Sequence, residues 1–335
     1  MRTRALGASG IQASVVGYGA WAIGGWMWGG ADEKSSIAAI HAALDAGITL
    51  IDTAPVYGFG HSEIVIGKAL AGRRDQAIIA TKCGLVVSND DNLGAFHFRS
   101  DRQARTPYGH IMVRKYLQPA SIRQELELSL KRLGTDYIDL YQTHWQDPTT
   151  PIADTMGTLL DLKREGKIRA IGACNANRAH LEEYQQFGVL DTAQEKYSML
   201  DRSIENESLP YCREHGIAML AYSPLGQGLL TGKIGSQRKF DEGDQRAANP
   251  RFSVENRQRI ADLLAQFQAI AADRKISLSQ LVIAWTLAQP GLSHALCGAR
   301  TPEQARENAA AGAIGLNDNE VKFMNATVAG FQLAG

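Results

Sequence analysis

The sequence lacks an excess of charge of either sign. Among its 335 residues, Lys and Arg together number 35, as do Asp and Glu, so the formal net charge is zero. Proteins that bind nucleic acid or anionic membranes through their overall charge carry a basic excess. We therefore expect no nucleic acid and no membrane among the partners of this chain.

Long apolar runs and closely spaced cysteines are also missing. No apolar stretch is long enough to cross a bilayer, and the first ten residues lack the apolar core of a signal peptide. The four cysteines, Cys83, Cys174, Cys212 and Cys297, lie far apart and show no metal-type spacing. We expect reduced thiols, no metal site and a cytoplasmic protein.

Strand-like runs alternate with helical patterns along the whole chain. A Gly-rich turn at 7–10 first predicts a β-hairpin within residues 2–14. Eight strand-like runs follow, at 15–19, 49–51, 77–80, 137–141, 170–173, 192–194, 218–222 and 294–297. This alternation is typical of a parallel sheet, and eight strands close a barrel. We predict an α/β fold, a (β/α)8 TIM barrel with an N-terminal β-hairpin, as a single domain over residues 1–335.

An open doubly wound sheet is the alternative fold. Such sheets often carry G-x-G-x-x-G between their first strand and a helix, whereas here the glycine pairs 24–25 and 29–30 lie in a Trp-rich loop. Helices are predicted at 33–45, at 121–133 with Ser121 as N-cap and Gly134 as C-cap, and at 152–167. Two long polar segments, 84–118 and 226–252, follow strands and should overhang the C-terminal mouth of a barrel.

The residues just past the strands carry the chemistry. In a barrel these positions face one shared mouth, and they include Asp52, Tyr57, Lys82 and His144. Asp52 is placed to neutralise Lys82, and Lys82 to lower the pKa of the Tyr57 hydroxyl and make it a better proton donor. His144 is placed to orient a carbonyl oxygen or relay a proton.

Each of these residues also has a structural interpretation. Asp52 could cap a loop, Lys82 could extend along the surface, Tyr57 could pack its ring, and His144 could be a satisfied core histidine. Their joint placement at the mouth favours function. Trp21, Trp26, Trp28, Tyr57, His144 and Trp145 are predicted to form an aromatic substrate pocket.

The sequence resembles the aldo-keto reductase superfamily over essentially its whole length. The motifs that carry the resemblance are GYGAWAIGG at 17–25, IDTAPVYGFGHSE at 51–63, ATKCG at 80–84, DYIDLYQTHW at 136–145, GKIRAIGACN at 166–175, AQEKYS at 193–198, LAYSPLGQGLLTGK at 220–233 and GARTPEQARENAAA at 298–311. The nearest branches are the bacterial methylglyoxal-reductase-like and general aldehyde reductases. The resemblance implies a catalytic tetrad of Asp52, Tyr57, Lys82 and His144, with Tyr57 as general acid.

The resemblance also implies hydride transfer from NADPH, or NADH, lying across the mouth without a metal. Tyr222 would stack on the nicotinamide ring, Asn175 and Gln194 would bind its carboxamide, and Ser223, Leu225 and Gln227 would follow the pyrophosphate. Cys174 stands where family members often have Ser, a stronger hydrogen-bonding group. The implied cofactor contacts are Gly19, Ala20, Trp21, Asp52, Cys174, Asn175, Gln194, Tyr222, Ser223, Pro224, Leu225, Gln227, Gly298, Arg300, Gln304, Glu307 and Asn308.

The adenosine end of this site also has a basis in the residues themselves. Thr301 and Pro302 are typical N-cap and first residues of a helix, and a helix N-terminus beside an arginine favours an anion. Arg300 is therefore predicted to bind the 2′-phosphate of NADPH. A simple surface helix cap is the alternative.

The function indicated is an NAD(P)H-dependent reductase of aldehyde or ketone carbonyls, such as methylglyoxal, small or aromatic aldehydes, sugars or keto-xenobiotics. One alternative is a dehydrogenase that oxidises sugars or cyclic alcohols. Another is a cofactor-sensing regulatory subunit, like the potassium-channel β subunits of the same fold. The sequence leaves the oligomeric state open between a monomer and a weak homo-oligomer.

Overall fold

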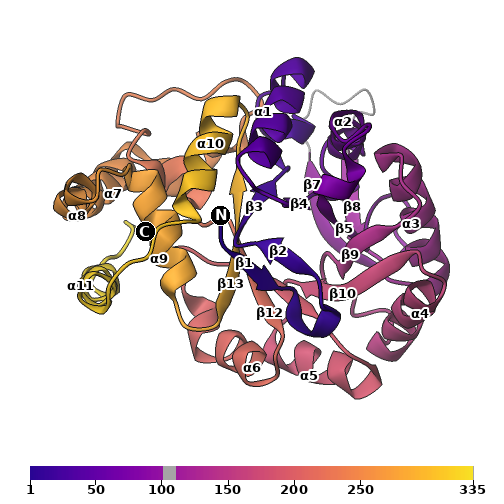
Figure 1. Cartoon of the computed structure of the whole chain (residues 1–335). Helices are drawn as coiled ribbons and strands as arrows, with labels where there is room; N and C mark the ends of the chain where they lie inside the picture. The colour runs from indigo at the N-terminus through magenta and orange to yellow at the C-terminus, as the bar shows by residue number, and fades with distance from the viewer. Residues whose placement is uncertain (101–110, 335) are drawn as a thin grey trace.

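The chain forms a closed barrel of eight parallel strands, as predicted (Figure 1). The computed structural model describes residues 1–100 and 111–334. Around the barrel the order is β10-β11-β12-β13-β3-β4-β5-β9, so each strand pairs with its neighbours in sequence. The strands are β3 (Val16–Gly19), β4 (Leu50–Asp52), β5 (Ile78–Cys83), β9 (Ile138–Thr143), β10 (Ile168–Cys174), β11 (Thr192–Lys196), β12 (Ala218–Tyr222) and β13 (Leu292–Gly298).

Helices surround this barrel and cover the outer faces of its strands (Figure 1). Because each crossover helix must bury one face against the sheet, the apolar residues recur at helical spacing, as Ile122, Leu126 and Leu130 do in α3. The helices are α1 (Glu33–Asp45), α2 (His61–Ala69), α3 (Pro119–Leu133), α4 (Ile152–Arg164), α5 (Arg178–Phe187), α6 (Ser208–Glu214), α7 (Val254–Ala265), α8 (Gln268–Asp273), α9 (Leu278–Ala288), α10 (Pro302–Ala311) and α11 (Asp318–Ala329).

The predicted hairpin closes one end of the barrel. Its strands, β1 (Thr3–Ala5) and β2 (Gln12–Ser14), pair antiparallel, and the hairpin lies across the barrel opening that faces the viewer in Figure 1. Leu6 and Ile11 from its turn are buried in one apolar cluster with Leu50, Leu140 and Leu220 from the barrel strands. The hairpin therefore seals the N-terminal end of the barrel, so a ligand must enter from the opposite, C-terminal end.

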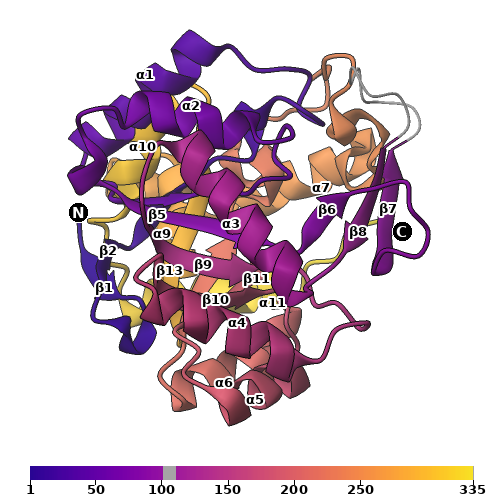
Figure 2. The ribbon, with the colours of Figure 1, turned by 90° about the vertical axis from the view of Figure 1, so that its right-hand side faces the viewer.

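The long segment after β5 is more ordered than the sequence suggested. It contains a three-stranded antiparallel sheet of β6 (Leu85–Val87), β7 (Ala95–Ser100) and β8 (Ile111–Lys115), in the order β6-β8-β7. This sheet lies at the opposite end of the barrel from the hairpin (Figure 2). Part of the predicted segment, 101–110, lies outside the described residues. The second long segment, 226–252, forms three short 3-10 helices, Gly226–Thr231, Gln245–Ala248 and Pro250–Phe252.

Helix ends test the capping predictions. Gly134 ends α3 in the left-handed conformation, as predicted, and Thr301 caps α10 with Pro302 at its first turn. Ser121 is not the N-cap of α3, because the helix begins two residues earlier at Pro119, whose fixed φ suits a first helical position. Ser121 instead donates a hydrogen bond to Glu125 at 3.2 Å within the helix.

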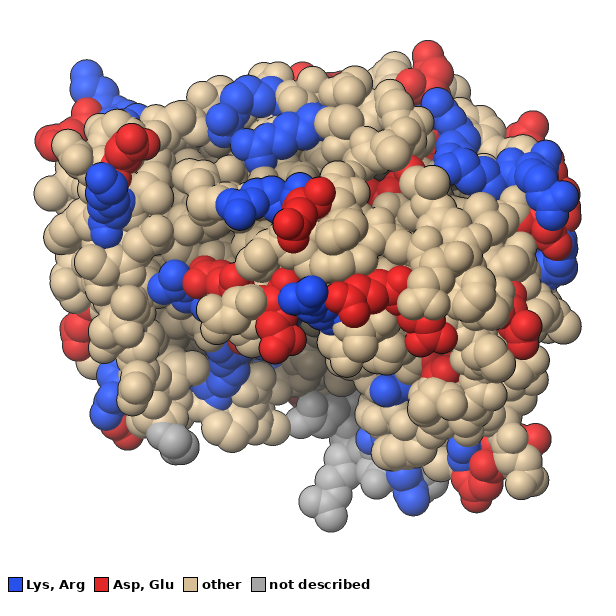
Figure 3. Space-filling view, turned by 90° about the horizontal axis from the view of Figure 1, so that it is seen from below, with Lys and Arg blue, Asp and Glu red and all other residues tan. Residues whose placement is uncertain are grey.

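The surface carries both signs of charge. On the face shown in Figure 3, basic and acidic side chains lie interspersed rather than segregated. Of the helices in the described part of the chain, none has the length and apolar character needed to cross a membrane.

Candidate active site

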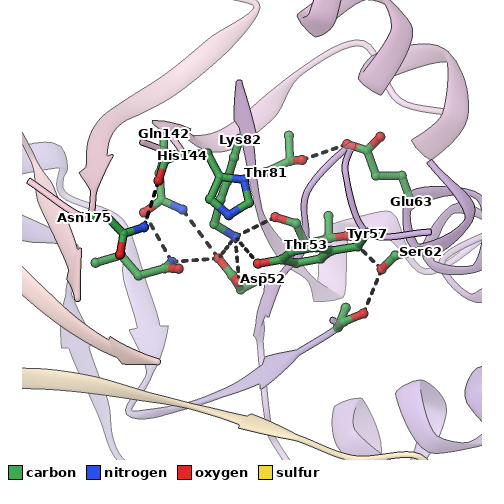
Figure 4. A network of polar contacts seen from close by, with 12 residues as sticks. Asp52, Thr53, Tyr57, Ser62, Glu63, Thr81, Lys82, Gln142, His144 and Asn175 are labelled. Carbon is green, nitrogen blue, oxygen red and sulfur yellow. Dashed lines mark hydrogen bonds and ion pairs between the residues drawn. The ribbon is translucent and has the colours of Figure 1, made fainter. Parts of the chain in front are cut away.

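Asp52 and Lys82 form a buried ion pair at the centre of the barrel mouth. Asp52 is the last residue of β4, and Lys82 lies near the end of the neighbouring strand β5. The Lys82 Nζ donates to both Asp52 carboxylate oxygens, at 3.0 and 2.8 Å, and to the Thr53 carbonyl at 2.8 Å (Figure 4). Burial opposes the charge of Lys82, but the Asp52 carboxylate outweighs it and the pKa of Lys82 lies above its ordinary value.

The Tyr57 hydroxyl lies within reach of this ion pair. The Lys82 Nζ is 3.4 Å from the hydroxyl oxygen and 5.0 Å from the centre of the Tyr57 ring. Burial raises the pKa of Tyr57 to about 12, although the charge of Lys82 acts in the lowering direction. The net lowering expected from the sequence is therefore wrong. At neutral pH Tyr57 carries its proton, which is the state required of an acid.

His144 follows β9 and completes the predicted tetrad. Its main-chain N–H donates to the Cys83 carbonyl at 2.8 Å, and its ring packs edge-on to Tyr57 at 5.7 Å between centres. Burial, with a smaller contribution from Lys82, holds the pKa of His144 well below its usual value. The imidazole is therefore neutral at physiological pH, so it can donate one N–H to a carbonyl oxygen without bringing a positive charge.

A wider set of hydrogen bonds holds the tetrad in place. Gln194 and Gln142 donate to the Asp52 Oδ1 at 2.8 and 3.4 Å. On the opposite side of β5, Glu63 of α2 accepts from Thr81 at 2.7 Å (Figure 4) and from Arg132 at 2.6 Å. Because Thr81 precedes Lys82 in β5, its hydrogen bond to Glu63 fixes β5 against α2. The rotamers of the four predicted tetrad residues are therefore set by packing and charge together.

One cavity of about 650 Å³ connects the tetrad with the predicted adenosine site. Tyr57 and His144 line it at one end, and Arg300 and Asn308 line it at the other. Of the implied cofactor contacts, Ala20 and Cys174 do not line the cavity. Both are buried, and their carbonyls accept hydrogen bonds from Ser62 and Gln146. The six predicted substrate-pocket residues all line the cavity: Trp21, Trp26, Trp28, Tyr57, His144 and Trp145.

The residues along this cavity fit a nicotinamide cofactor. Asn175 donates to the His144 carbonyl at 2.9 Å and accepts from the Tyr222 hydroxyl at 2.9 Å. The Asn175 amide keeps a second N–H for a carboxamide. The Gln194 amide nitrogen donates to the Asp52 Oδ1 at 2.8 Å and to the Gln142 Oε1 at 3.4 Å, so Gln194 can offer a carboxamide its amide oxygen as an acceptor. Gly19 and Gly298 line the cavity without side chains that would fill it. A Cβ atom at Gly298 would point into open space, with the Gly19 carbonyl as its one neighbour within 4 Å, at 3.7 Å. The remaining predicted contacts, Trp21, Ser223, Pro224, Leu225, Gln227, Gln304 and Glu307, also line the cavity.

Several lining residues were not predicted from the sequence. His97 and Phe98 of β7 close the substrate end, where His97 packs on Trp145 at 4.8 Å and Phe98 stacks on Trp26 at 5.8 Å between ring centres. Burial and Lys115 lower the pKa of His97 to about 4, so this ring is uncharged. The pattern AFHFRS at 95–100 is strand-like and was the available signal.

At the cofactor end, two ion pairs were also missed. Lys233 pairs with Glu307 at 2.6 Å, and Arg246 pairs with Asp244 at 2.6 Å while lying 4.9 Å from the Trp28 ring centre. Both pairs involve the segment 226–252, which lies near the α10 end of the cavity. This position depends on the path of a long connection, so local sequence patterns could not predict it.

Comparison with known proteins is consistent with this geometry. The model of the aldo/keto reductase family matches residues 15–329. The chain belongs to the aldo/keto reductase family. It is 46% identical over 330 residues to an NADH-specific methylglyoxal reductase of Escherichia coli, with 97% of each chain covered.

Two solved structures extend the comparison. A glycerol dehydrogenase from Gluconobacter oxydans is 38% identical, with a TM-score of 0.84 and coverage of 98% of this chain and 94% of that one. An aldo-keto reductase from Klebsiella pneumoniae in complex with NADPH is 25% identical, with a TM-score of 0.70 and coverage of 97% and 95%. As a member of this family the chain is an oxidoreductase of carbonyl and alcohol groups that uses a nicotinamide cofactor.

Proposed function

We propose that this aldo/keto reductase reduces aldehydes and ketones to alcohols, with Tyr57 as the proton donor. The observation that carries the proposal is the contact of Lys82 with both the Asp52 carboxylate and the Tyr57 hydroxyl at the end of the cavity. A nicotinamide cofactor bound there would supply the hydride. The protein's part is to bind the carbonyl, exclude water and deliver one proton.

Each member of the tetrad has a separate task in this mechanism. The Tyr57 hydroxyl gives its proton to the carbonyl oxygen as that oxygen gains negative charge. The tyrosinate left behind is stabilised by the Lys82 ammonium 3.4 Å away, and Asp52 keeps that ammonium charged and oriented. The neutral His144 ring donates a hydrogen bond to the same carbonyl oxygen, which orients the substrate.

The substrate end of the cavity favours uncharged compounds. It is lined by rings, whereas the cationic lining residues, Lys233, Arg238, Arg246 and Arg300, come from the segment 226–252 and from just before α10. Arg246, which lies 4.9 Å from the Trp28 ring centre, is paired with Asp244. We therefore propose small or aromatic aldehydes, including methylglyoxal, as substrates, in agreement with the name of the Escherichia coli relative. The glycerol dehydrogenase neighbour favours a second candidate, the oxidation of small polyols by the same groups in reverse.

Cofactor absorbance with a panel of substrates tests this proposal. We expect oxidation of NADPH or NADH with methylglyoxal and nitrobenzaldehyde, and slower turnover with aldoses, keto-steroids and fungal keto-toxins. The reverse reaction is followed with glycerol and a cyclic alcohol. Tight cofactor binding without turnover of any of these compounds would favour a cofactor-sensing regulatory protein instead.

Cofactor choice is proposed to depend on Arg300. The Arg300 guanidinium donates to the carbonyls of Gly30 at 2.8 Å and Trp28 at 3.4 Å. In the part of the chain that the structure describes, its remaining N–H groups have no acceptor, and Arg300 lies just before the N-terminus of α10. We propose that both cofactors are used and that this permanent charge favours NADPH through its 2′-phosphate. The Klebsiella neighbour supports NADPH, and the Escherichia coli relative, named NADH-specific, supports NADH.

Arg300→Ala should lower the ratio of kcat/KM for NADPH to that for NADH by about 10-fold or more, since a charged hydrogen bond contributes about 1.5–3 kcal/mol. The control is Arg306→Ala in α10, six residues further along the chain. The Arg306 side chain is 63% exposed, and its removal should leave the ratio unchanged. A wild-type preference for NADH, or an unchanged ratio in the Arg300 variant, would show that Arg300 does not bind the phosphate.

We place the protein in the cytoplasm. All four cysteines are free and buried in the structure, and unpaired thiols are typical of proteins kept in a reducing compartment.

A further inference from the structure

Glu195 is a buried carboxyl group that the mechanism above does not use. It lies in β11, next to Gln194, and is 9% exposed. Its Oε1 accepts the main-chain N–H of Ala176 at 2.7 Å. Within residues 1–100 and 111–334 this is the one hydrogen bond of the Glu195 carboxyl group, and no cation pairs with that group. A buried carboxyl group with so few partners is costly unless it serves a purpose.

The residue next to that hydrogen bond has an unusual backbone. Asn175 adopts a φ of 53°, in the left-handed region that residues other than glycine seldom occupy. Its N–H donates to the Gln194 carbonyl at 3.1 Å, and the following N–H, that of Ala176, goes to Glu195. Two consecutive residues of β11 therefore hold the turn that leaves β10, one through its main chain and one through its side chain.

The turn at Asn175 sets the direction of the Asn175 side chain. With this backbone, the Asn175 amide donates to the His144 carbonyl at 2.9 Å (Figure 4) and accepts from the Tyr222 hydroxyl at 2.9 Å. All three of these residues line the cavity where the nicotinamide is proposed to lie. A different backbone at Asn175 would withdraw the amide from both partners.

We propose that Glu195 is a positioning residue for the cofactor: it holds the left-handed turn at Asn175 and so aims the Asn175 amide at the nicotinamide carboxamide. The inference rests on the proposed function, because it assumes that the nicotinamide lies beside Asn175. Burial raises the pKa of Glu195 to about 8, which agrees with a carboxyl group retained without a cation.

The test measures cofactor binding directly, through quenching of tryptophan fluorescence during titration with NADPH, since Trp21 and Trp28 line the cavity. Glu195→Ala should raise the Kd for NADPH by about 10-fold, because the Ala176 N–H loses its buried acceptor. Glu195→Gln should bind within about threefold of wild type, because its amide oxygen accepts the same hydrogen bond. At saturating NADPH, kcat should change much less than KM for the cofactor.

A matched control separates positioning from general destabilisation. Glu125 is also a carboxyl group whose pKa burial raises to about 8, and it accepts a main-chain N–H, that of Gly84, at 3.1 Å. Glu125→Ala should lower the melting temperature but leave the Kd for NADPH within about threefold of wild type, since the main chain that it holds, at Gly84, does not position the Asn175 amide.

Combination with Asn175→Ala tests whether Glu195 acts through Asn175. In that background Glu195→Ala should raise the Kd by less than about threefold, because the amide it positions is already gone. The inference is wrong if Glu195→Ala binds NADPH as wild type does, or if its effect is undiminished without the Asn175 amide. Failure of the wild-type protein to bind NADPH or NADH would instead contradict the proposed function.

Discussion

Replacing Tyr57 with Phe should lower kcat for carbonyl reduction by about 10²-fold or more, the usual effect of removing a positioned acid. The substitution keeps the ring, which packs against His144 and Trp21, and removes only the hydroxyl that lies 3.4 Å from Lys82. Binding of NADPH, followed by tryptophan fluorescence, should stay within about threefold of wild type, because the proton donor acts on the substrate in the transition state.

A second tyrosine provides the control for this change. Tyr137 precedes β9 at the end of the barrel away from the mouth, and its ring packs against the Arg74 guanidinium at 4.2 Å. Tyr137→Phe removes the same atom at a distance from the cavity and should leave kcat unchanged. If Tyr57→Phe kept half of the wild-type activity, Tyr57 would not be the acid.

Lys82→Met is expected to abolish activity and to destabilise the protein. The substitution removes the charge that would stabilise a tyrosinate at Tyr57. It also breaks the ion pair in which the Lys82 Nζ lies 2.8 Å from the Asp52 carboxylate, which is left buried without a cation. Breaking a buried ion pair in this way typically costs about 3–5 kcal/mol. Activity per folded molecule and the urea midpoint of unfolding should therefore both fall.

Substitutions at Lys68, a surface lysine, and at Asp52, the ion-pair partner of Lys82, separate the loss of activity from the loss of stability. Lys68→Met removes an ion pair with Glu33, 2.8 Å long, from a lysine that is 52% exposed, and should change stability by at most about 1 kcal/mol. Asp52→Asn should reduce activity less than Lys82→Met, because Lys82 keeps its charge and loses only its orientation. Wild-type turnover by soluble Lys82→Met protein would show that Lys82 has only a structural role.

The barrel and the tetrad were predictable from the sequence because both follow from position along the strands. The eight runs and their order were correct, and placing Asp52 and Lys82 at neighbouring strand ends was enough to expect their ion pair, which the structure has. The sign of the Tyr57 pKa shift was not predictable in this way. The sequence shows that Lys82 is near, whereas the burial that raises the pKa of Tyr57 depends on the loops above it.

The substrate end was the least predictable part of the site. In β7 the register shifts between Phe96 and Phe98, so the regular alternation of a strand is broken. Phe96 is 57% exposed, while Phe98 lines the cavity. No rule of period two could have assigned these two rings to different faces. The start of α3 was also mispredicted. Ser121 is a residue of the usual N-cap type, but the helix begins earlier, with Pro119 as its first residue.

Transfer of deuterium from the cofactor to the substrate tests the central claim most directly. The wild-type protein is given methylglyoxal and NADPH deuterated on one face of C4, then NADPH deuterated on the other face, and the alcohol is analysed by mass spectrometry. In the proposed mechanism a substrate carbonyl at the Tyr57 hydroxyl would meet a nicotinamide held beside Asn175 in one orientation, since both residues line the same cavity. We therefore expect one deuterium on the former carbonyl carbon from one of the two cofactors only. Transfer from neither, or equally from both, would contradict the account.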